Sequence, residues 1–203
     1  EDFMADSIFN RLRIRASYGT TGNDRLSDFG FLERFGSADY NGNPGLTNIA
    51  PANPNLKWEE TATFDVGIKT GILNDLFRLN VNYYDKRTTD LLIPVPVDGR
   101  TGNSVVDRNA GELNNSGFEF DLGASIFRDS EFKWDLNFNL STVNNEIIAL
   151  PGAGTDAQGR QFIQGTPAQR AVVGESANSF YLIPYLGVNP ETGDAEWLSI
   201  DGD

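Results

Sequence analysis

The residues that could do chemistry in this chain are carboxylates, because the sequence contains no histidine and no cysteine. Without these two residue types the segment lacks the commonest general base, the commonest activated nucleophiles and the ligands of structural zinc. The pairs Glu59/Glu60 and Glu119/Asp121 could serve as the acids of a glycosidase. Alternation instead favours a solvated strand face for Glu119 and Asp121, and the sequence predicts no enzyme.

Oxygen ligands also gather near the end of the sequence, in residues 189–194 and then at Asp201 and Asp203. A segment beginning Asp-x-Asp can open a calcium-binding loop. The sequence stops before the other ligands of such a loop could follow, so an acidic surface turn is the alternative. Asp201 and Asp203 are the calcium candidates, and no other metal or cofactor is expected.

Charge and hydropathy restrict the class of protein. The 203 residues carry a formal net charge of −13, from 16 Lys+Arg and 29 Asp+Glu, which argues against a nucleic-acid partner. No apolar run is long enough for a membrane helix, so a spanning structure would have to be a β-barrel. The chain opens at Glu1 without a signal peptide and closes in a polar stretch, and we expect a piece of a longer protein.

The elements that would position these side chains are long strands with strict alternation of apolar and polar residues. Each run is about 10 residues, the length that a tilted strand needs to cross a bilayer. Period-two alternation is the sequence signature of a strand. The expected strands cover residues 11–19, 60–70, 76–85, 118–127 and 132–140, and a sixth is expected beyond them.

One face of these strands is unusually polar. Three arginines alternate along the first strand, which would be costly in a dry core and costs little in water. The other face is apolar, so it either packs on a soluble core or faces lipid while the polar face lines a barrel lumen. The expected lumen-facing residues are Arg11, Arg13, Arg15, Asp65, Lys69, Arg78, Glu119, Asp121, Lys133 and Asp135.

The connections separate these two alternatives. Residues 72–75 and 128–131 form tight turns, whereas residues 20–59, 86–117 and 142–171 form long loops. Short and long connections alternate, as in outer-membrane barrels with short periplasmic turns and long extracellular loops. We therefore expect an all-β chain: five or six long strands of a transmembrane antiparallel β-barrel. In the second long connection, residues 94–97 cannot pair regularly at both prolines, which predicts the end of a strand that projects beyond the membrane.

Aromatic residues in the first long loop are candidates for contact with a ligand. Phe29, Phe31, Phe35 and Tyr40 could stack on sugar rings or pack against a lid protein outside the cell. Packing within the loop itself is the alternative.

Several stretches resemble the SusC/RagA family of TonB-linked outer-membrane transporters. They occur in the family's order and spacing over nearly the whole chain: residues 12–23 ("LRASYGxTGN"), 53–61 ("NPxLKWE"), 81–92 ("DYYxKxTxDLL"), 109–119 ("NxGxxxNxGxE"), 173–181 ("VGxxxxSFY") and 187–194 ("GxxPxTGD"). The departures are small, with Asn189 where an Asp is common and residues 182–184 in place of a Gly-Tyr pairing.

The resemblance implies a barrel of roughly 22 strands with a plug in its lumen. It also implies TonB as the energy-coupling partner, a SusD-like surface lipoprotein as a lid, and import of oligosaccharides or peptides too large for porins. Residues 1–203 would be part of one barrel domain, without plug or TonB box, in the outer membrane of a Gram-negative bacterium. A surface or secreted β-rich adhesion or carbohydrate-binding module without transport is the alternative function.

The polar face leads to one further expectation. If the first hairpin closes with Gly71 opposite Leu76, Lys69 lies opposite Arg78. Because like charges directly opposed are unfavourable, we expect a plug carboxylate nearby. The polar residues would then hold the plug or line the path that opens when it moves, and plain hydration of the lumen is the alternative.

Overall fold

The computed structural model describes residues 7–24, 26, 28–128 and 130–198, and the described chain is built almost entirely of strands. One 3-10 turn, η2 (Gly99–Thr101), accompanies them. No helix in these residues is long and apolar enough to cross a membrane. The strands are β1 (Phe9–Asn23), β2 (Arg34–Tyr40), β3 (Asn43–Ala50), β4 (Glu59–Ile72), β5 (Phe77–Pro96), β6 (Val105–Ile126), β7 (Trp134–Ser141), β8 (Asn144–Ala149), β9 (Gly154–Thr155), β10 (Gln161–Gln164), β11 (Gln169–Val172), β12 (Ser179–Phe180), β13 (Tyr185–Val188) and β14 (Ala195–Trp197).

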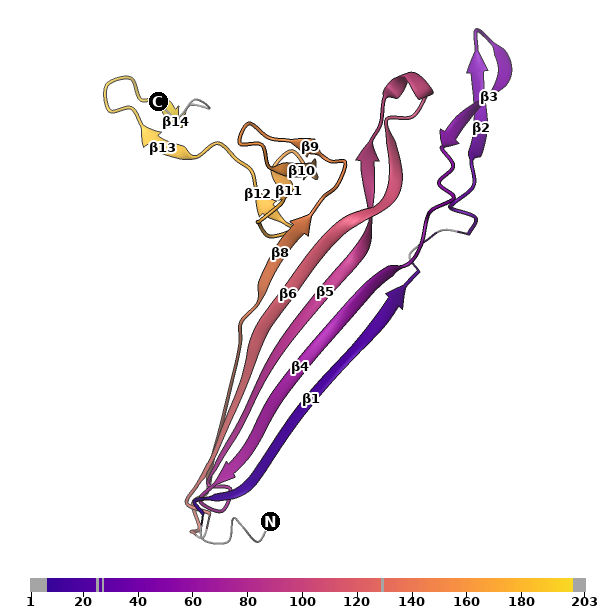
Figure 1. The fold of residues 1–203 in the computed structure, drawn as a ribbon. Helices are drawn as coiled ribbons and strands as arrows, with labels where there is room; N and C mark the ends of the chain where they lie inside the picture. The colour runs from indigo at the N-terminus through magenta and orange to yellow at the C-terminus, as the bar shows by residue number, and fades with distance from the viewer. Residues whose placement is uncertain (1–6, 25, 27, 129, 199–203) are drawn as a thin grey trace.

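The main sheet has the strand order β1-β4-β5-β6-β7, and β8 also pairs with β6. All of these pairs are antiparallel. The strands lie side by side as one tall curved layer, with the start of β1 and the short turns at one end (Figure 1). The β2–β3 hairpin, the β5–β6 tip and all strands after β8 lie at the other end, here called the loop end. The all-β fold and the placement of every long connection at one end are confirmed.

Two of the long loops expected from the sequence are largely strands. The region 86–117 continues the β5–β6 hairpin to Pro96 and resumes at Val105. Residues 86–90 and 112–116 are mostly polar on both faces, so they show no period-two alternation. A strand tolerates such residues where neither face meets lipid. The region 20–59 contains the β2–β3 hairpin. Conversely, β7 begins at Trp134, so the expected strand at 132–140 is two residues too long at its start.

The two prolines of β5 lie where a sheet tolerates them. Pro94 and Pro96 pair with Asp107 and Val105 of β6, at a level that β4 does not reach, because its last pair with β5 joins Glu60 to Thr89. Proline lacks a backbone N–H, so it is accepted where one side of the strand is free. The prediction that a strand ends here is confirmed, because β5 ends at Pro96. The expectation that both prolines could not pair regularly is wrong, and the position beyond the membrane stays a prediction.

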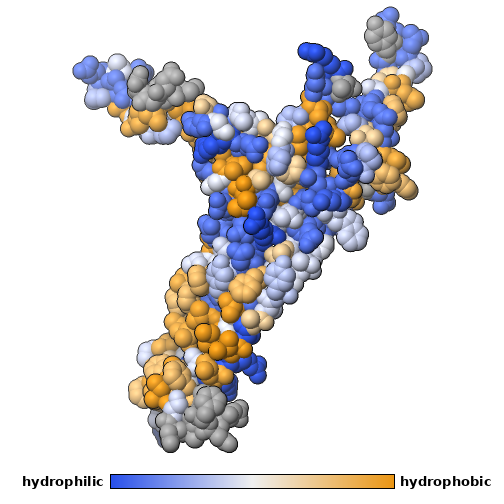
Figure 2. Space-filling model, viewed as in Figure 1, coloured by the Kyte–Doolittle hydropathy of each residue, from blue (hydrophilic) through white to orange (hydrophobic). Residues whose placement is uncertain are grey.

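Among the residues that the structure describes, the buried apolar side chains lie at the loop end. Val95 and Val106 of the β5–β6 tip are buried, as are Ile147, Leu150 and Val172 of the segments that follow. The tall part of the sheet is a single layer whose apolar side chains remain partly or largely exposed, and two of them, Ile14 and Phe138, are more than half exposed. Figure 2 shows apolar residues gathered over the lower part of the sheet, toward the N-terminal end. The sheet therefore has one apolar face and one polar face, and neither is covered by another layer.

Candidate lumen wall and loop-end surfaces

The strand register arranges the polar face of the sheet in horizontal rows. One row joins Arg13, Lys69, Asn80, Asp121 and Asn139 across five strands. The next row toward the loop end joins Arg15, Gly67, Asn82 and Glu119. The expected lumen-facing residues fall on this face, as members of β1, β4, β5, β6 and β7, except Lys133, which precedes β7.

Asn82 is the centre of the second row. Its side chain is 6% exposed, accepts a hydrogen bond from the Arg15 guanidinium at 2.8 Å and donates to Asp65 at 2.9 Å. It also donates to Glu119 at 3.4 Å, while Arg15 lies 3.6 Å from the Asp65 carboxylate. One amide thus ties together side chains from β1, β4 and β6.

A glycine between these side chains makes the contact possible. Gly67 is the Cα partner of both Arg15 and Asn82. A Cβ at this position would overlap the Asn82 side-chain oxygen and lie 3.0 Å from Arg15 Nε. Glycine therefore lets the Arg15 and Asn82 side chains cross the strand between them.

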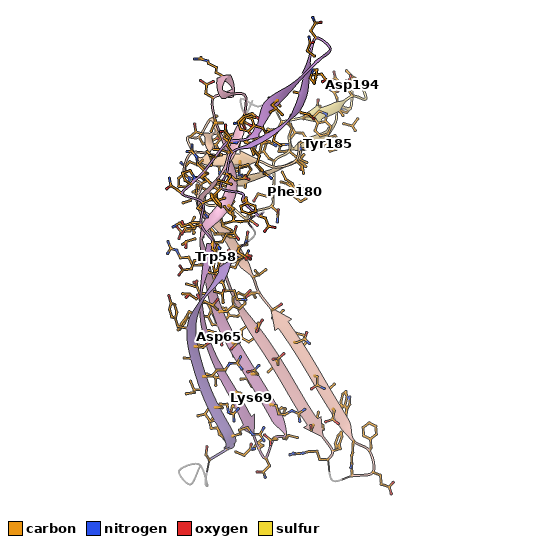
Figure 3. The ribbon with its side chains drawn as sticks, turned by 90° about the vertical axis from the view of Figure 1, so that its right-hand side faces the viewer. Trp58, Asp65, Lys69, Phe180, Tyr185 and Asp194 are labelled. Atoms are coloured by element: carbon orange, nitrogen blue, oxygen red, sulfur yellow. The ribbon has the colours of Figure 1, made fainter. Side chains whose placement is uncertain are left out.

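Nearer the short turns, the polar face carries an open hollow of about 270 Å³. Lys69 and Arg78 line it together with Asn80, Asp121 and two asparagines of β7. The Arg78 guanidinium donates to the Ser125 hydroxyl at 2.9 Å, and Asn80 donates to Asp121 at 2.8 Å. Figure 3 shows Asp65 and Lys69 at successive levels of the sheet, well below the loop end.

The expected opposition of Lys69 and Arg78 is wrong. The hairpin closes with Ile72 opposite Phe77, so Lys69 faces Asn80 and Arg78 faces Gly71. The register differs because Leu73, Asn74 and Asp75 all have positive φ, at 53°, 55° and 64°, a turn that the sequence pattern did not reveal. The cationic residue opposite Lys69 is Arg13, on the other side of β4.

A second polar cluster, which sequence reasoning missed, locks the 53–59 segment onto the β5–β6 hairpin. Asn109 donates to the Lys57 and Asp90 carbonyls at 2.6 and 2.8 Å and accepts from the Lys57 N–H at 2.8 Å. Lys57 Nζ lies 2.6 Å from the Asp90 carboxylate. Asp90 has φ 56° and stands in the irregular stretch between Thr88 and Leu91. Positive φ favours Asn, Asp or Gly. The Asp at position 90 is therefore the only signal for this bulge in the sequence.

Glu59 belongs to the same region and is 8% exposed. Its carboxylate accepts hydrogen bonds from the Asn23 amide at 2.8 Å and the Leu92 N–H at 3.0 Å. Glu59 was considered above as half of an acid pair with Glu60. Its structural partners occupy both oxygens, so it joins β1, β4 and β5 at the level where β4 begins.

Three of the four aromatic candidates of the first loop lie on the surface. Phe29, Phe31 and Phe35 are 69%, 47% and 57% exposed, which disfavours packing within the loop. Tyr40 is the last residue of β2 and pairs with Asn43. These residues belong to the hairpin arm that rises from the loop end in Figure 1.

A larger apolar surface lies on the last segment and was not anticipated. The β13–β14 hairpin projects away from the sheet (Figure 1), and Figure 3 places Phe180 and Tyr185 at the loop end. Tyr185 packs on Trp197 with ring centroids 5.2 Å apart. The side chains of this arm that are more than half exposed are Phe180, Tyr181, Leu182, Ile183, Tyr185, Leu186, Val188 and Trp197.

The small sheet β12-β11-β10-β9 is held by charged and aromatic contacts. The Arg170 guanidinium lies 4.5 Å from the Phe162 ring centroid and 3.6 Å from that of Tyr181. Arg160 bridges Asp156 at 2.9 Å and Glu175 at 2.8 Å. Burial by itself raises the pKa of the Asp156 carboxyl, but hydrogen bonds from the Arg160 backbone and guanidinium outweigh it and lower the pKa. The hydrogen bonds to Glu175 and Asp156 raise the pKa of Arg160.

Metal ligation finds no support in the described part of the chain, where no three carboxylates gather as a metal site would require. Asp201 and Asp203 lie outside the described residues. The preceding acidic stretch forms the β13–β14 turn, in which the Asn189 side chain accepts from the backbone N–H groups of Glu191 and Thr192.

Comparison with known proteins gives matches over nearly the whole chain. A family model described as "TonB dependent receptor-like, beta-barrel" matches residues 6–198. TonB-dependent receptor P26 of Formosa agariphila is 34% identical over 193 residues, which cover 92% of this chain and 19% of that protein. TonB-dependent receptor SusC of Bacteroides thetaiotaomicron is 34% identical over 211 residues, which cover 95% of this chain and 21% of that protein.

The solved structures agree with these relatives. The structure titled "Structure of the RagAB peptide transporter" matches with a TM-score of 0.79 and 26% identity, over 98% of this chain and 22% of that one. The RagAB importer in its "open-open" state matches with a TM-score of 0.81 over 96% of this chain. The chain therefore spans about a fifth of the length of the relatives that it matches.

Proposed function

This chain belongs to the TonB-dependent receptor β-barrel family of outer-membrane transporters, and from that premise we propose that it forms part of the wall of a nutrient importer. The imported nutrients are too large for porins, and the segment does no chemistry on them. The observation that carries the proposal is the single-layer sheet with one apolar and one polar face, whose long connections all lie at one end. This is the anatomy of a barrel wall between lipid and lumen.

The proposal assigns a role to each part of the chain. The polar face lines the lumen and contacts a plug, which would belong to another part of the protein, together with the box that engages TonB. The loop-end arms face the outside of the cell, where exposed aromatic residues such as Phe29 and Phe35 receive a SusD-like surface lipoprotein or the nutrient. The lack of histidine and cysteine fits a protein that moves its cargo unchanged.

Oligosaccharides are the first substrate class that we propose. Aromatic side chains at the loop end would stack on sugar rings, and SusC is among the relatives at 34% identity. Peptides are the second class, favoured by the likeness to the RagAB peptide transporter. An adhesion module without transport is disfavoured, because the family model covers nearly the whole chain.

Uptake by intact cells tests the proposal. The full-length protein is expressed in a host that lacks its own copy, and accumulation of fluorescent oligosaccharides and peptides is measured with and without functional TonB. We expect uptake of one class to depend on both the protein and TonB. Uptake that persists without TonB, or outer-membrane material that binds ligand without importing it, would refute the importer role.

A further inference from the structure

The polar face holds an excess of positive charge close to the short-turn end of the sheet. Five of the chain's 16 basic residues lie there in three adjacent rows: Arg11, Arg13, Arg15, Lys69 and Arg78. This concentration contrasts with the net charge of −13 for the whole chain. A protein that is acidic overall has gathered cations on one small area of one face.

Two of these cations have carboxylate partners within the sheet. Arg11 lies 3.5 Å from Asp75, and Arg15 lies 3.6 Å from Asp65. Arg78 is held by a hydroxyl, because its guanidinium donates to Ser125 and lies over Gly123, where a Cβ would come within 3.0 Å of it. The remaining two, Arg13 and Lys69, form no ion pair with any residue that the structure describes.

Arg13 and Lys69 are also directly opposed. They are Cα partners in the β1–β4 ladder, on the same face of the sheet. Like charges in this position repel each other, and the pair is accepted when an anion lies between or above the two groups. The acidic neighbour in the same row, Asp121, stands two strands from Lys69, accepts a hydrogen bond from Asn80, and forms no ion pair with Lys69 or Arg13.

We propose that Arg13 and Lys69 form a binding site for one carboxylate of the plug, presented by an Asp or Glu side chain from another part of the same polypeptide. The inference rests on the proposed function, since it takes the polar face for the lumen wall of a plugged barrel. The hollow beside Lys69 measures about 270 Å³, which suits a side chain and is too small for a nutrient that porins exclude. Four fifths of the length of the relatives lies outside this segment and can supply the carboxylate.

Arg13, Lys69 and Arg78 would together act as a latch near the short-turn end. The latch is far from the loop end, where nutrient enters, so it contacts the plug without obstructing the entrance (Figure 3). The positive charge of these three residues also determines how substitutions should affect the plug. Neutralising the cations should loosen the plug, because a carboxylate left in the hollow would lose its partners.

Zero-length cross-linking of the full-length protein tests the latch. A carbodiimide joins an amine to a carboxylate only when the two are in contact, and mass spectrometry of the purified protein in detergent identifies the pair. We expect Lys69 to be joined to an Asp or Glu of the plug. The Lys57–Asp90 pair, at 2.6 Å, is the internal positive control, and Lys69→Arg should remove only the Lys69 product.

Hydrogen exchange of the plug, measured in a variant that lacks both cations, is the second test. Arg13→Gln combined with Lys69→Gln should raise hydrogen exchange of the plug several-fold while the exchange of β4 and β5 stays unchanged. Arg34→Gln, which removes a loop-end charge, is the matched control. A Lys69 product with Asp121 alone, no Lys69 product beside a normal Lys57 product, or unchanged plug exchange would each overturn the latch. Normal uptake with any of these results leaves the importer role standing, so the two proposals fail separately.

Discussion

At the scale of single residues, the polar face is organised by groups that a sequence pattern shows only as alternating polar letters. Asn82 is hydrogen-bonded to three charged side chains, and Gly67 leaves the space that Asn82 and one of them, Arg15, occupy. Both positions read as unremarkable polar or small residues in the sequence. Their roles follow from the register, which places Arg15, Gly67 and Asn82 in one row.

The first prediction concerns this row. Asn82→Ala should lower the free energy of unfolding of the full-length protein by about 1 to 3 kcal/mol, because the charged partners lose their shared hydrogen bonds. Urea titration in detergent micelles measures the change. Asn139→Ala is the matched control, since no hydrogen bond of its side chain is recorded among the described residues and it lies on the same face. Equal losses for the two variants would contradict the role of Asn82.

The second prediction is a pH dependence at the loop end. The folded pKa of Asp156 lies below its ordinary value, so its contribution to stability is complete above that value and is lost as the pH falls through the lowered pKa. We expect the β9–β12 sheet to loosen in strong acid and to remain closed near neutrality. Hydrogen exchange of the β10 and β11 amides, corrected for the intrinsic rate at each pH, measures this.

The matched variant for that titration is Asp156→Asn, which removes the charge and keeps the shape. It should loosen the small sheet at neutral pH and flatten the acid dependence, because Arg160 then keeps only Glu175 as an ionic partner. An unchanged acid transition in the variant would show that another carboxylate is responsible.

At the scale of elements, the strands β1, β4, β5, β6 and β7 are dictated by alternation, since a period of two places every second side chain on the same face. A charge placed on the apolar face should therefore cost more folding free energy the closer it lies to the middle of the membrane. Val66→Lys, in the middle of β4, should cost about 2 to 4 kcal/mol of folding free energy in lipid vesicles. Leu136→Lys, in the same row as Ile72 and near the start of β7, should cost less than Val66→Lys.

The control for this third prediction is Ile72→Lys, at the end of the same strand and on the same face. It should cost only about 0 to 1 kcal/mol, because the lysine can reach the interface. Urea titration of the full-length protein in vesicles gives both values. A cost that does not vary along the strand would argue against contact between this face and lipid.

At the scale of the whole molecule, the wall and the loop end have different proposed roles: the wall faces lipid and lumen, and the loop end contacts ligand or lipoprotein. The wall is predictable from the sequence: five strands, their two faces and the one-sided long connections all appear as expected, because they follow from alternation and turn composition. The limits of the prediction are equally physical. Residues near Thr88 and Asn114 are polar on both faces, so they read as loop although they pair across β5 and β6.

The candidate site was predicted less completely than the wall. The opposition of Arg13 and Lys69 could not be identified because it belongs to the β1–β4 ladder, whose register the long sequence between these two strands does not reveal. The buried Glu59 and the Asn109 cluster were missed because their partners lie 33 and 52 residues away in the sequence. The exposed arm at β13–β14 was missed because exposure depends on what a segment packs against.

The fourth prediction belongs to this scale, because it concerns assembly. Phe29→Ser combined with Phe35→Ser should weaken binding of the proposed SusD-like lipoprotein about tenfold, since exposed aromatics carry much of the energy of an interface. Co-purification and titration of the two full-length proteins in detergent measure the affinity. Phe132→Ser, which removes an equally exposed ring at the short-turn end, should leave it unchanged. Unaltered binding in the first variant would place the lipoprotein elsewhere.

The β5–β6 hairpin has a further consequence. Above the level where β4 stops, it stands as a two-stranded post fastened at its foot by Asn109 and Lys57. Since the pairing repeats every two residues, inserting or deleting two residues in each strand changes the height of this post by about 7 Å while every side chain keeps its face. The rim of the barrel can therefore be raised or lowered in discrete steps without any change to the wall below, which makes rim height a variable that evolution or design can adjust independently of transport.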